Sequence, residues 1–121
     1  MFIVENLMKS VKDEDIERNY FYRLMKSNMI FWHGSKPIKI KAYGIEIERQ
    51  DTLNGKIVNI ERDCIKNISP QIHRVTGLLN TLYRYCVSPF HLTDIIGDYE
   101  DECLLDFDNE IKEVASFMRG K

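Results

Sequence analysis

The dipeptide Asn54-Gly55 constrains the fold of this chain more than any other feature of the sequence. It separates residues 38–50 from residues 56–62, two segments in which apolar and polar side chains alternate. Asn and Gly both tolerate the positive φ angles of a type I′ turn, which joins neighbouring antiparallel strands. The pattern therefore predicts a β-hairpin with strands over 38–50 and 56–62, and with Val58 and Ile60 turned towards the core.

The first of these strands changes phase in its middle. Its apolar residues fall on even positions up to Ala42 and on odd positions from Tyr43 onwards. One inserted residue would keep both sets on the same face, so the change predicts a β-bulge near Ala42-Tyr43. Gly44 favours this interpretation, since glycine inside a strand is typical of a bulge or of a close approach by another backbone segment.

A helix is expected directly after the hairpin. Ser69 is a favourable N-cap, and Pro70 is a favourable first residue of a helix. Apolar residues then recur at helical spacing: Ile72, Val75, Leu79, Leu82, Tyr83 and Cys86. Such a helix covers one face of a sheet, and we expect Gly77 to allow close packing there.

The chain on either side of this unit is less uniform. Ile3, Leu7 and Val11 follow a helical spacing, so residues 1–18 are expected to form an N-terminal helix or a flexible segment. The aromatic-rich segment 19–32 predicts a strand. Residues 19–121 are then expected to form a single domain.

The C-terminal third predicts further helices. Ser88-Pro89 repeats the start signal of the first helix. From about 98 to 119 there are apolar residues at helical spacing and no Pro or Gly, which predicts a helix with an acidic start. The predicted fold class is α+β: a small antiparallel three-stranded β-meander packed against two or three C-terminal helices.

Composition limits the classes of function. Hydrophobic residues make up 44% of the 121 residues and charged residues 30%, which suits a folded domain. There is no apolar run of membrane-spanning length and no secretory signal at the start, so we expect a cytoplasmic protein with no membrane partner. Three widely spaced cysteines, Cys64, Cys86 and Cys103, predict free thiols rather than disulfides.

Charge is unevenly distributed although the net charge is only −2. Between residues 98 and 113 there are eight acidic residues and one basic residue, Lys112. This segment is either a solvated helix face or a surface that binds a basic partner. The candidate partner-binding residues are Asp98, Tyr99, Glu100, Asp101, Glu102, Asp106, Asp108 and Glu110.

His91 and Asp94 are three residues apart, so on a helix they face the same side. One hypothesis is an acid–base pair, with Cys86 as a further reactive group. We favour a structural interpretation, in which Ser88, His91 and Asp94 stabilise a helix–helix corner by hydrogen bonds. We expect no catalytic residues here.

Other chemistry has little support in the sequence. His73, Cys86, His91 and Cys103 lack a recognised metal-ligand spacing, so no metal site is expected. Glycine-rich phosphate-binding motifs are absent, and no cofactor is expected. The lysines at 36, 39 and 41 are better explained as a solvated strand edge than as a nucleic-acid surface, so direct nucleic-acid binding is not expected.

Two segments resemble a known family. Tyr43-Gly44-Ile45-Glu46 and the segment from Ser88 to Asp94 are similar to the Tyr-Gly-Ile-Glu and Ser-Pro-x-His-Leu-x-Asp motifs of a family of short uncharacterised bacterial (Firmicute-type) proteins, a domain of unknown function. The resemblance covers about residues 20–100 and leaves the two ends of the chain as extensions. It implies a small intracellular bacterial α+β domain and no particular activity.

Three function hypotheses follow. The first is a non-enzymatic bacterial protein that regulates a protein partner by binding it. The second is an inhibitor encoded by a phage or mobile element, which blocks a host nuclease or a CRISPR- or restriction-type defence through an acidic, nucleic-acid-mimicking surface. The third is a small enzyme that uses His91. We expect the first, with a basic nucleic-acid-binding protein or nuclease among the candidate partners. The exposed strand edge also makes a homodimer a candidate assembly.

Overall fold

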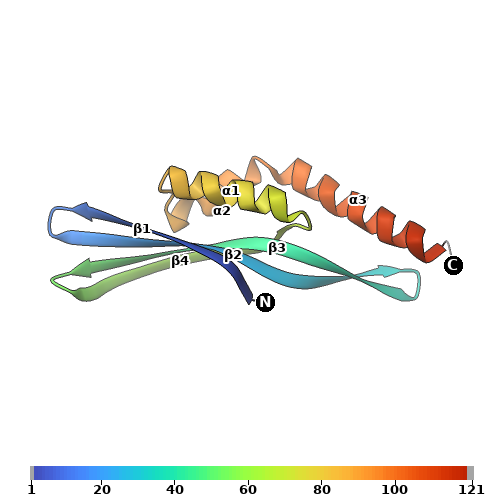
Figure 1. The fold of residues 1–121 in the computed structure, drawn as a ribbon, viewed down its shortest axis with the longest axis horizontal. Coiled ribbons are helices and arrows are strands. Elements are labelled where there is room, and N and C mark those ends of the chain that lie inside the picture. Colours follow the sequence, from blue (N-terminus) through green and yellow to red (C-terminus); the bar gives the residue numbers. More distant parts are fainter. Residues whose placement is uncertain (1, 120–121) are drawn as a thin grey trace.

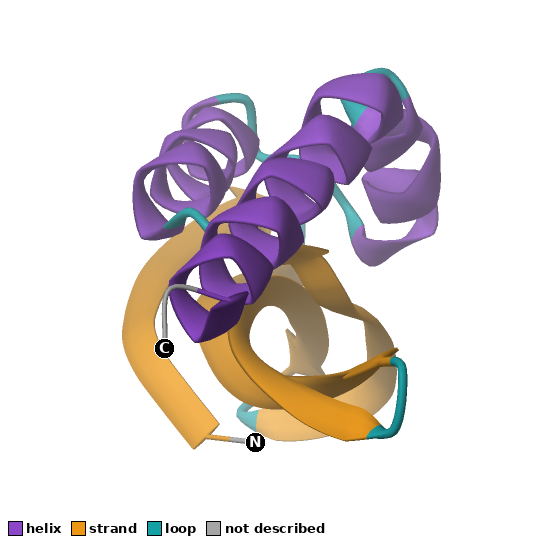
Figure 2. Cartoon of the chain, turned by 90° about the vertical axis from the view of Figure 1, so that its right-hand side faces the viewer, coloured by secondary structure: helices purple, strands orange, loops and turns teal. Residues whose placement is uncertain are grey.

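The computed structural model describes residues 2–119, with side chains described as far as Phe117. Four strands are followed by three helices and a short 3₁₀ turn: β1 (Phe2–Asp13), β2 (Ile16–His33), β3 (Lys36–Leu53), β4 (Lys56–Ser69), α1 (Ile72–Arg84), η1 (Pro89–His91), α2 (Leu92–Gly97) and α3 (Glu100–Arg119). The strands form one antiparallel sheet in the order β1-β2-β3-β4. The helices lie on one side of this sheet (Figure 1), which curls beneath them (Figure 2). The predicted α+β class is confirmed, with four strands in the meander rather than three.

The additional strand is β1. The expected helix or flexible segment over residues 1–18 is wrong, because residues 2–13 pair with β2 from Phe2↔Lys26 to Asp13↔Ile16. A two-residue turn at Glu14-Asp15 joins the two strands. The spacing of apolar residues in this segment fits a helix, but pairing with the aromatic strand β2 decides the local structure. A single-sequence pattern does not reveal that pairing.

The hairpin at Asn54-Gly55 is confirmed. Asn54 and Gly55 have φ angles of 52° and 79°, as a type I′ turn requires. The strand after the turn is longer than predicted and continues to Ser69. Val58 and Ile60 are 58% and 49% exposed, so the expectation that they face the core is wrong.

The predicted bulge near Ala42-Tyr43 is not on β3. The pairing of β2 with β3 continues without a register shift, so neither strand carries an inserted residue there. The irregularity lies between β3 and β4, where Tyr43 pairs with Ser69 but Ile45 pairs with Ile65. Residues 66–68 of β4 therefore stand opposite a single residue of β3.

That single residue is Gly44, and only glycine fits there. A Cβ atom on Gly44 would lie 2.1 Å from the carbonyl oxygen of Ile65 and 2.2 Å from that of Lys66. The predicted close approach of another backbone segment is therefore correct, and that segment is β4.

The change of phase in β3 reflects contacts with different helices. Ile45 and Ile47 belong to the main core. Ile38 and Ile40 form a second cluster with Ala115 of α3. Because the ribbon of β2 and β3 has no register break, we attribute the change of face to its twist.

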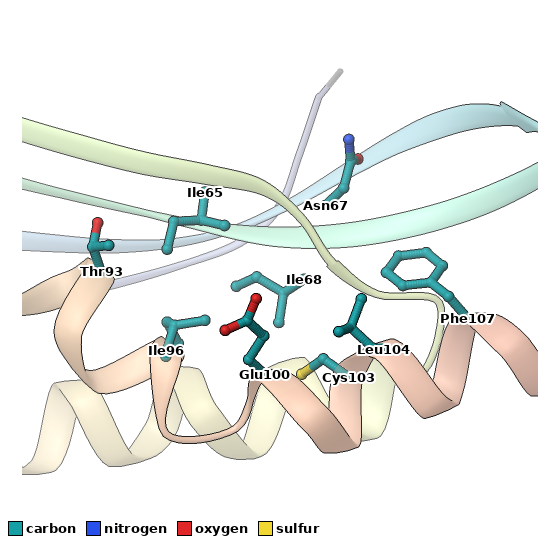
Figure 3. Close-up of a pocket in the computed structure, with 10 residues that line it drawn as sticks. Ile65, Asn67, Ile68, Thr93, Ile96, Glu100, Cys103, Leu104 and Phe107 are labelled. Atoms are coloured by element: carbon teal, nitrogen blue, oxygen red, sulfur yellow. The ribbon is translucent and has the colours of Figure 1, made fainter.

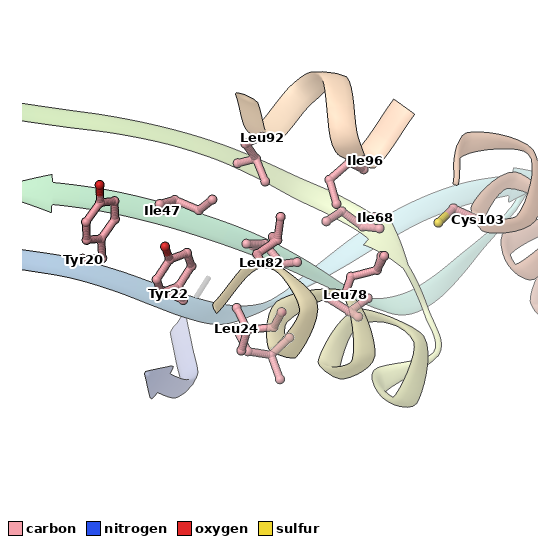
Figure 4. Close-up of a cluster of buried hydrophobic side chains, with 13 residues drawn as sticks. Tyr20, Tyr22, Leu24, Ile47, Ile68, Leu78, Leu82, Leu92, Ile96 and Cys103 are labelled. Atoms are coloured by element: carbon pink, nitrogen blue, oxygen red, sulfur yellow. The ribbon is translucent and has the colours of Figure 1, made fainter. Parts of the chain in front are cut away.

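The main core lies between the middle of the sheet and the helices (Figure 4). Its fully buried side chains include Tyr22, Leu24, Ile45, Ile47, Val75, Leu79, Leu82 and Leu92. Tyr22 also donates a hydrogen bond from Oη to Val87 O at 2.9 Å, so its hydroxyl is satisfied inside the core. β2, β3, α1 and α2 are thereby joined in one packed unit.

α1 begins at Ile72, two residues later than its sequence predicts. Ser69 ends β4 and its Oγ accepts a hydrogen bond from Gln71 N at 3.0 Å. Gly77 is exposed, and a Cβ atom there would meet nothing within 4 Å. The expected close packing at Gly77 is therefore wrong. In the part of the chain that is described, no helix is long and apolar enough to cross a bilayer.

Candidate functional site

A partly buried ion pair attaches α3 to the rest of the protein. Arg74 of α1 donates from Nε and Nη2 to the two carboxylate oxygens of Asp106, the second at 3.1 Å. Its Nη1 donates to Glu102 Oε2 at 2.9 Å. Ser69 at the end of β4 adds a hydrogen bond from Oγ to Asp106 Oδ2 at 2.7 Å. α3 is therefore held where β4 ends and α1 begins.

These contacts change the role expected for Asp106. Its side chain is only 12% exposed. Hydrogen bonds from Arg74, together with that from Ser69, outweigh burial and hold the pKa of this carboxyl below its usual range. Asp106 is thus a charged residue whose partners lie within the protein. The expectation that it faces a binding partner is corrected, and Glu102, although exposed, already shares Arg74.

The other predicted surface residues differ in exposure. Those that are exposed are Asp98, Glu100, Asp101, Glu102 and Asp108. Tyr99 and Glu110 are half-buried, and Tyr99 packs against the main core. Tyr99 therefore has a structural role as well as a place beside the acidic residues.

Two leucines lie among the exposed acids of α3. Leu104 and Leu105 are 54% and 56% exposed. With Asp101 and Asp108 they follow the i, i+3, i+4, i+7 spacing that places side chains on one face of a helix. We call Asp101, Leu104, Leu105 and Asp108 the outer face of α3. This face is amphipathic, because it combines negative charge with exposed apolar area.

A groove of about 310 Å³ opens beside the outer face, between β4, α2 and α3 (Figure 3). Its apolar lining consists of Ile65, Ile68, Ile96, Cys103, Leu104 and Phe107. Glu100 also lines it, and its carboxylate is turned towards the apolar side chains. Leu104 belongs to both features, so the groove and the outer face form one continuous surface.

The β4 wall of the groove lies at the irregular pairing opposite Gly44. Ile65 is the last paired residue before the extra residues 66–68, Ile68 is one of those extra residues, and both line the groove. Asn67 between them accepts a hydrogen bond at Oδ1 from Ser27 Oγ of β2 at 2.7 Å, which fixes the displaced segment. On the helical side, burial raises the pKa of the Cys103 thiol, so this side chain is neutral and contributes apolar lining to the groove.

The predicted corner at Ser88, His91 and Asp94 is formed by the backbone. His91 N donates to Ser88 O at 3.1 Å, which closes η1. Neither η1 nor α2 has a side-chain hydrogen bond at its N-cap, and His91 and Asp94 are both exposed. The expected side-chain hydrogen bonds between these residues are therefore wrong.

Cys86 packs against the main core. It has a φ angle of 52° just after α1, where its N–H donates to Tyr83 O at 3.2 Å. The next residue donates to Leu82 O at 3.0 Å, and the two bonds together form a Schellman motif. The thiol lies against Tyr22, where burial with Cys86 alongside raises the pKa of the tyrosine. Among the described side chains, no group of three or more His, Cys, Asp or Glu residues could hold a metal ion.

The helix-free face of the sheet carries an ion network that the sequence pattern did not reveal. Arg23 donates from Nη1 to Glu46 at 2.7 Å and to Glu48 at 3.1 Å. Arg62 and Gln50 donate to Glu48 at 2.8 Å and 2.6 Å. Glu48 is only 3% exposed. The one available signal was that Glu46 and Glu48 alternate with the core residues of β3.

Comparison with known proteins gives a family but no activity. No curated protein and no solved structure matches the chain. The family match covers residues 1–102, so it includes β1, which the resemblance in the sequence had placed outside, and it ends near the start of α3. Through this match the chain belongs to DUF6514, a family of unknown function.

Proposed function

We propose that this is a non-enzymatic bacterial protein that regulates a partner protein by binding it, and that the partner docks on the groove and the outer face of α3. The proposed occupant is a basic amphipathic segment, with apolar side chains for the groove and Lys or Arg for the acidic rim. The main support for this proposal is that the apolar groove is continuous with the outer face of α3, which combines acidic residues with exposed leucines.

Charge complementarity supports this occupant. Glu100 lines the groove, and Asp101 and Asp108 flank the two exposed leucines. The described hydrogen bonds and ion pairs engage none of these three carboxylates. They can therefore pair with cations of another molecule. Leu104 and Leu105 are of the kind that become buried when a partner segment fills a groove.

Mimicry of nucleic acid by a phage-type inhibitor remains an alternative for the same surface. Exposed acids along one side of α3 favour it. The two exposed leucines and the apolar groove instead favour a protein segment with apolar side chains. The nucleic-acid-binding groove of a nuclease recognises phosphates by charge and would not require apolar contacts of this kind. The third hypothesis, an enzyme that uses His91, gains no support from the described side-chain hydrogen bonds, which include none between His91 and Asp94.

The experiment is selection from a library of random peptides displayed on phage against the immobilised protein. We expect selected peptides to combine Lys or Arg with Leu, Ile or Phe. Their affinity should fall about tenfold or more on Leu104→Asp and on Glu100→Lys, because a charged pair or a filled pocket lost at an interface core costs that much. Glu113→Lys makes the same charge change at an exposed position of α3 outside the groove and should leave affinity unchanged.

Two results would contradict the proposal. One is a selection without basic and apolar enrichment. The other is equal loss of affinity in Glu100→Lys and Glu113→Lys, which would indicate non-specific attraction to an acidic helix. In the second case, binding of a basic nuclease that survives Leu104→Asp would favour the mimicry alternative.

A further inference from the structure

β1 is an exposed edge strand with an unusual amount of apolar surface. It pairs with β2 on one side, and within the described residues it has no strand on the other. Five of its twelve residues are exposed large hydrophobics: Phe2 58%, Ile3 52%, Val4 44%, Met8 62% and Val11 40%. A long apolar edge of this kind is a template for pairing with another strand.

The opposite edge, β4, is less suited to pairing. It has two register shifts relative to β3, one on either side of the segment from Ile45 to Asp51. α2 also contacts it, through a hydrogen bond from Thr93 Oγ1 to Asp63 Oδ2 at 3.4 Å. β1 has one shift, between Ile3 and Glu5, and is regular from there to its end. The regular part of β1 is the better edge.

Symmetry limits how β1 can pair with itself. Opposite residues in an antiparallel ladder alternate between hydrogen-bonded and non-hydrogen-bonded pairs. A two-fold axis perpendicular to the sheet maps the pair formed by residues i and j onto the pair formed by j and i. Both pairs must be of the same kind, so i and j differ by an even number of residues. The axis must therefore pass through a residue that lies opposite itself. Near the middle of β1 the candidates are Asn6, Leu7 and Met8.

Charge decides among these three registers. With Leu7 opposite itself, Glu5 of each copy lies opposite Lys9 of the other. With Asn6 at the axis, Glu5 would face the apolar Leu7, and with Met8 at the axis Lys9 would face Leu7. Opposite charges directly across two strands are stabilising, and the Leu7 register creates this pair twice.

We propose that β1 pairs antiparallel with β1 of a second copy of this chain, with Leu7 opposite Leu7 on the two-fold axis, so that the sheet continues across both copies. Leu7 is half-buried and packs against the main core, and this register joins the two cores. On the other face, Met8 comes opposite Asn6 and diagonal to Val4 and Met8 of the second copy, which covers exposed apolar area.

The surroundings of Lys9 fit this arrangement. Lys9, Asn80, Tyr83 and Arg84 line a depression of about 460 Å³ beside the edge of β1. Lys9 Nζ donates to Tyr83 O at 2.6 Å and has two further protons to donate. Glu5 of the second copy would enter this depression between two cations. The surface is separate from the groove and from α3, so the proposal stands independently of the proposed function.

The first test is the oligomeric state and its response to charge. Sedimentation equilibrium of the wild-type protein should give the mass of a dimer. Glu5→Lys and Lys9→Glu should each weaken the dimer about tenfold, because each replaces two attractive pairs by two repulsive ones. The double variant should restore it. Circular dichroism of each variant checks that the monomer is folded.

The second test is the register. Leu7→Cys should form an intermolecular disulfide rapidly on mild oxidation, since directly opposite residues have the Cα separation that a disulfide requires. Val11→Cys is the matched control on the same edge, because position 11 of the second copy would lie about 26 Å further along the strand. Peptide mass spectrometry distinguishes these bonds from bonds of Cys64, Cys86 or Cys103.

Three results would overturn the proposal: a monomeric wild-type protein at the highest soluble concentration, equal crosslinking at positions 7 and 11, or a double charge variant no more dimeric than the single ones. The comparison of the double variant with Lys9→Glu isolates the charge pairs, because both proteins lack the hydrogen bond from Lys9 to Tyr83 O.

Discussion

The two halves of β3 reach two different cores. Ile45 and Ile47 lie in the main core, which has thirteen buried residues drawn from the sheet and all three helices. Ile38 and Ile40 lie in a cluster that has one further buried residue, Ala115 of α3. Both pairs alternate with polar residues in the same way, and both are almost completely buried. Burial of the side chain alone does not distinguish them.

The difference lies in what surrounds each half. Around Ile45 and Ile47, three strands and the helices hold one another in place, so opening that region requires global unfolding. Residues 27–42 form an arm of β2 and β3 alone, with no other strand paired to it within the described residues, and α3 completes the buried cluster on this arm. Regions with few packed neighbours open at lower free energy than the rest of a protein. The arm and the C-terminal half of α3 should therefore open first.

The largest loss of stability is expected from a substitution at Gly44, the residue between the two halves of β3. Gly44→Ala places a methyl group within 2.2 Å of two carbonyl oxygens of β4, and backbone cannot move aside as a flexible side chain can. We expect the free energy of unfolding to fall by more than about 4 kcal/mol, measured by urea denaturation. A loss below about 1 kcal/mol would show that β4 is not held against Gly44.

Gly77→Ala is the matched control. The same methyl group enters open space on an exposed face of α1. Alanine has the higher helix propensity, so this variant should be more stable than the wild type by about 0.5–1 kcal/mol. The two substitutions thus have opposite expected signs.

Truncation of one isoleucine in each half tests the comparison directly. Ile47→Ala leaves a cavity in the main core and should lower the free energy of unfolding by about 3–4 kcal/mol. Ile40→Ala should lower it by about 2 kcal/mol, at the low end for such changes. In Ile40→Ala, amide hydrogen exchange should become faster in the arm and in α3 but not in α1. Equal losses with equal exchange patterns would show that the two clusters form one cooperative unit.

The smallest effect concerns the face of β3 opposite Ile47. Burial alone would raise the pKa of Glu48, but hydrogen bonds from Gln50, Arg23 and Arg62 hold it below its usual range. A lowered pKa stabilises the fold at all pH values above the unfolded value of about 4.3, and this contribution is lost as the pH falls further. Glu48→Gln should cost about 1–2 kcal/mol at pH 7.

Urea denaturation at a series of pH values measures this contribution. The wild type should lose stability below about pH 4.5 more steeply than Glu48→Gln does. Arg62→Gln removes one donor and retains the other two, so its pH dependence should lie between them. Parallel curves for all three proteins would mean that Glu48 titrates alike in the folded and unfolded chain.

Local patterns predicted the parts of the fold that local physics decides. The turn at Asn54-Gly55 and the long helix α3 depend on neighbouring residues, and both are present. The phase change in β3 was visible, but its cause was not. An insertion in β4 opposite Gly44 and the twist of a two-stranded arm both arise from segments far away in the sequence. β1 was missed for the same reason.

The candidate surface shows the same limit. Its acidic character could be read from residues 98–113, because charge is a property of single residues. The groove could not, since it is assembled from Ile65, Ile96 and Phe107 on three elements. Nor could the pairing of Asp106 with Arg74, which lie 32 positions apart.

The absence of a loop between β4 and α1 has a consequence for folding. Within the described residues, every strand of the sheet pairs with its neighbours along the chain, through turns at 14–15, 34–35 and 54–55. Antiparallel neighbours joined by two-residue turns need no crossover connection, so each hairpin can close without the helices. Only Pro70 and Gln71 then separate the last strand from the first helix. Once β4 has paired with β3, this short connection places the start of α1 beside the sheet. We therefore expect the helices to pack after the β3–β4 hairpin has closed, and not before.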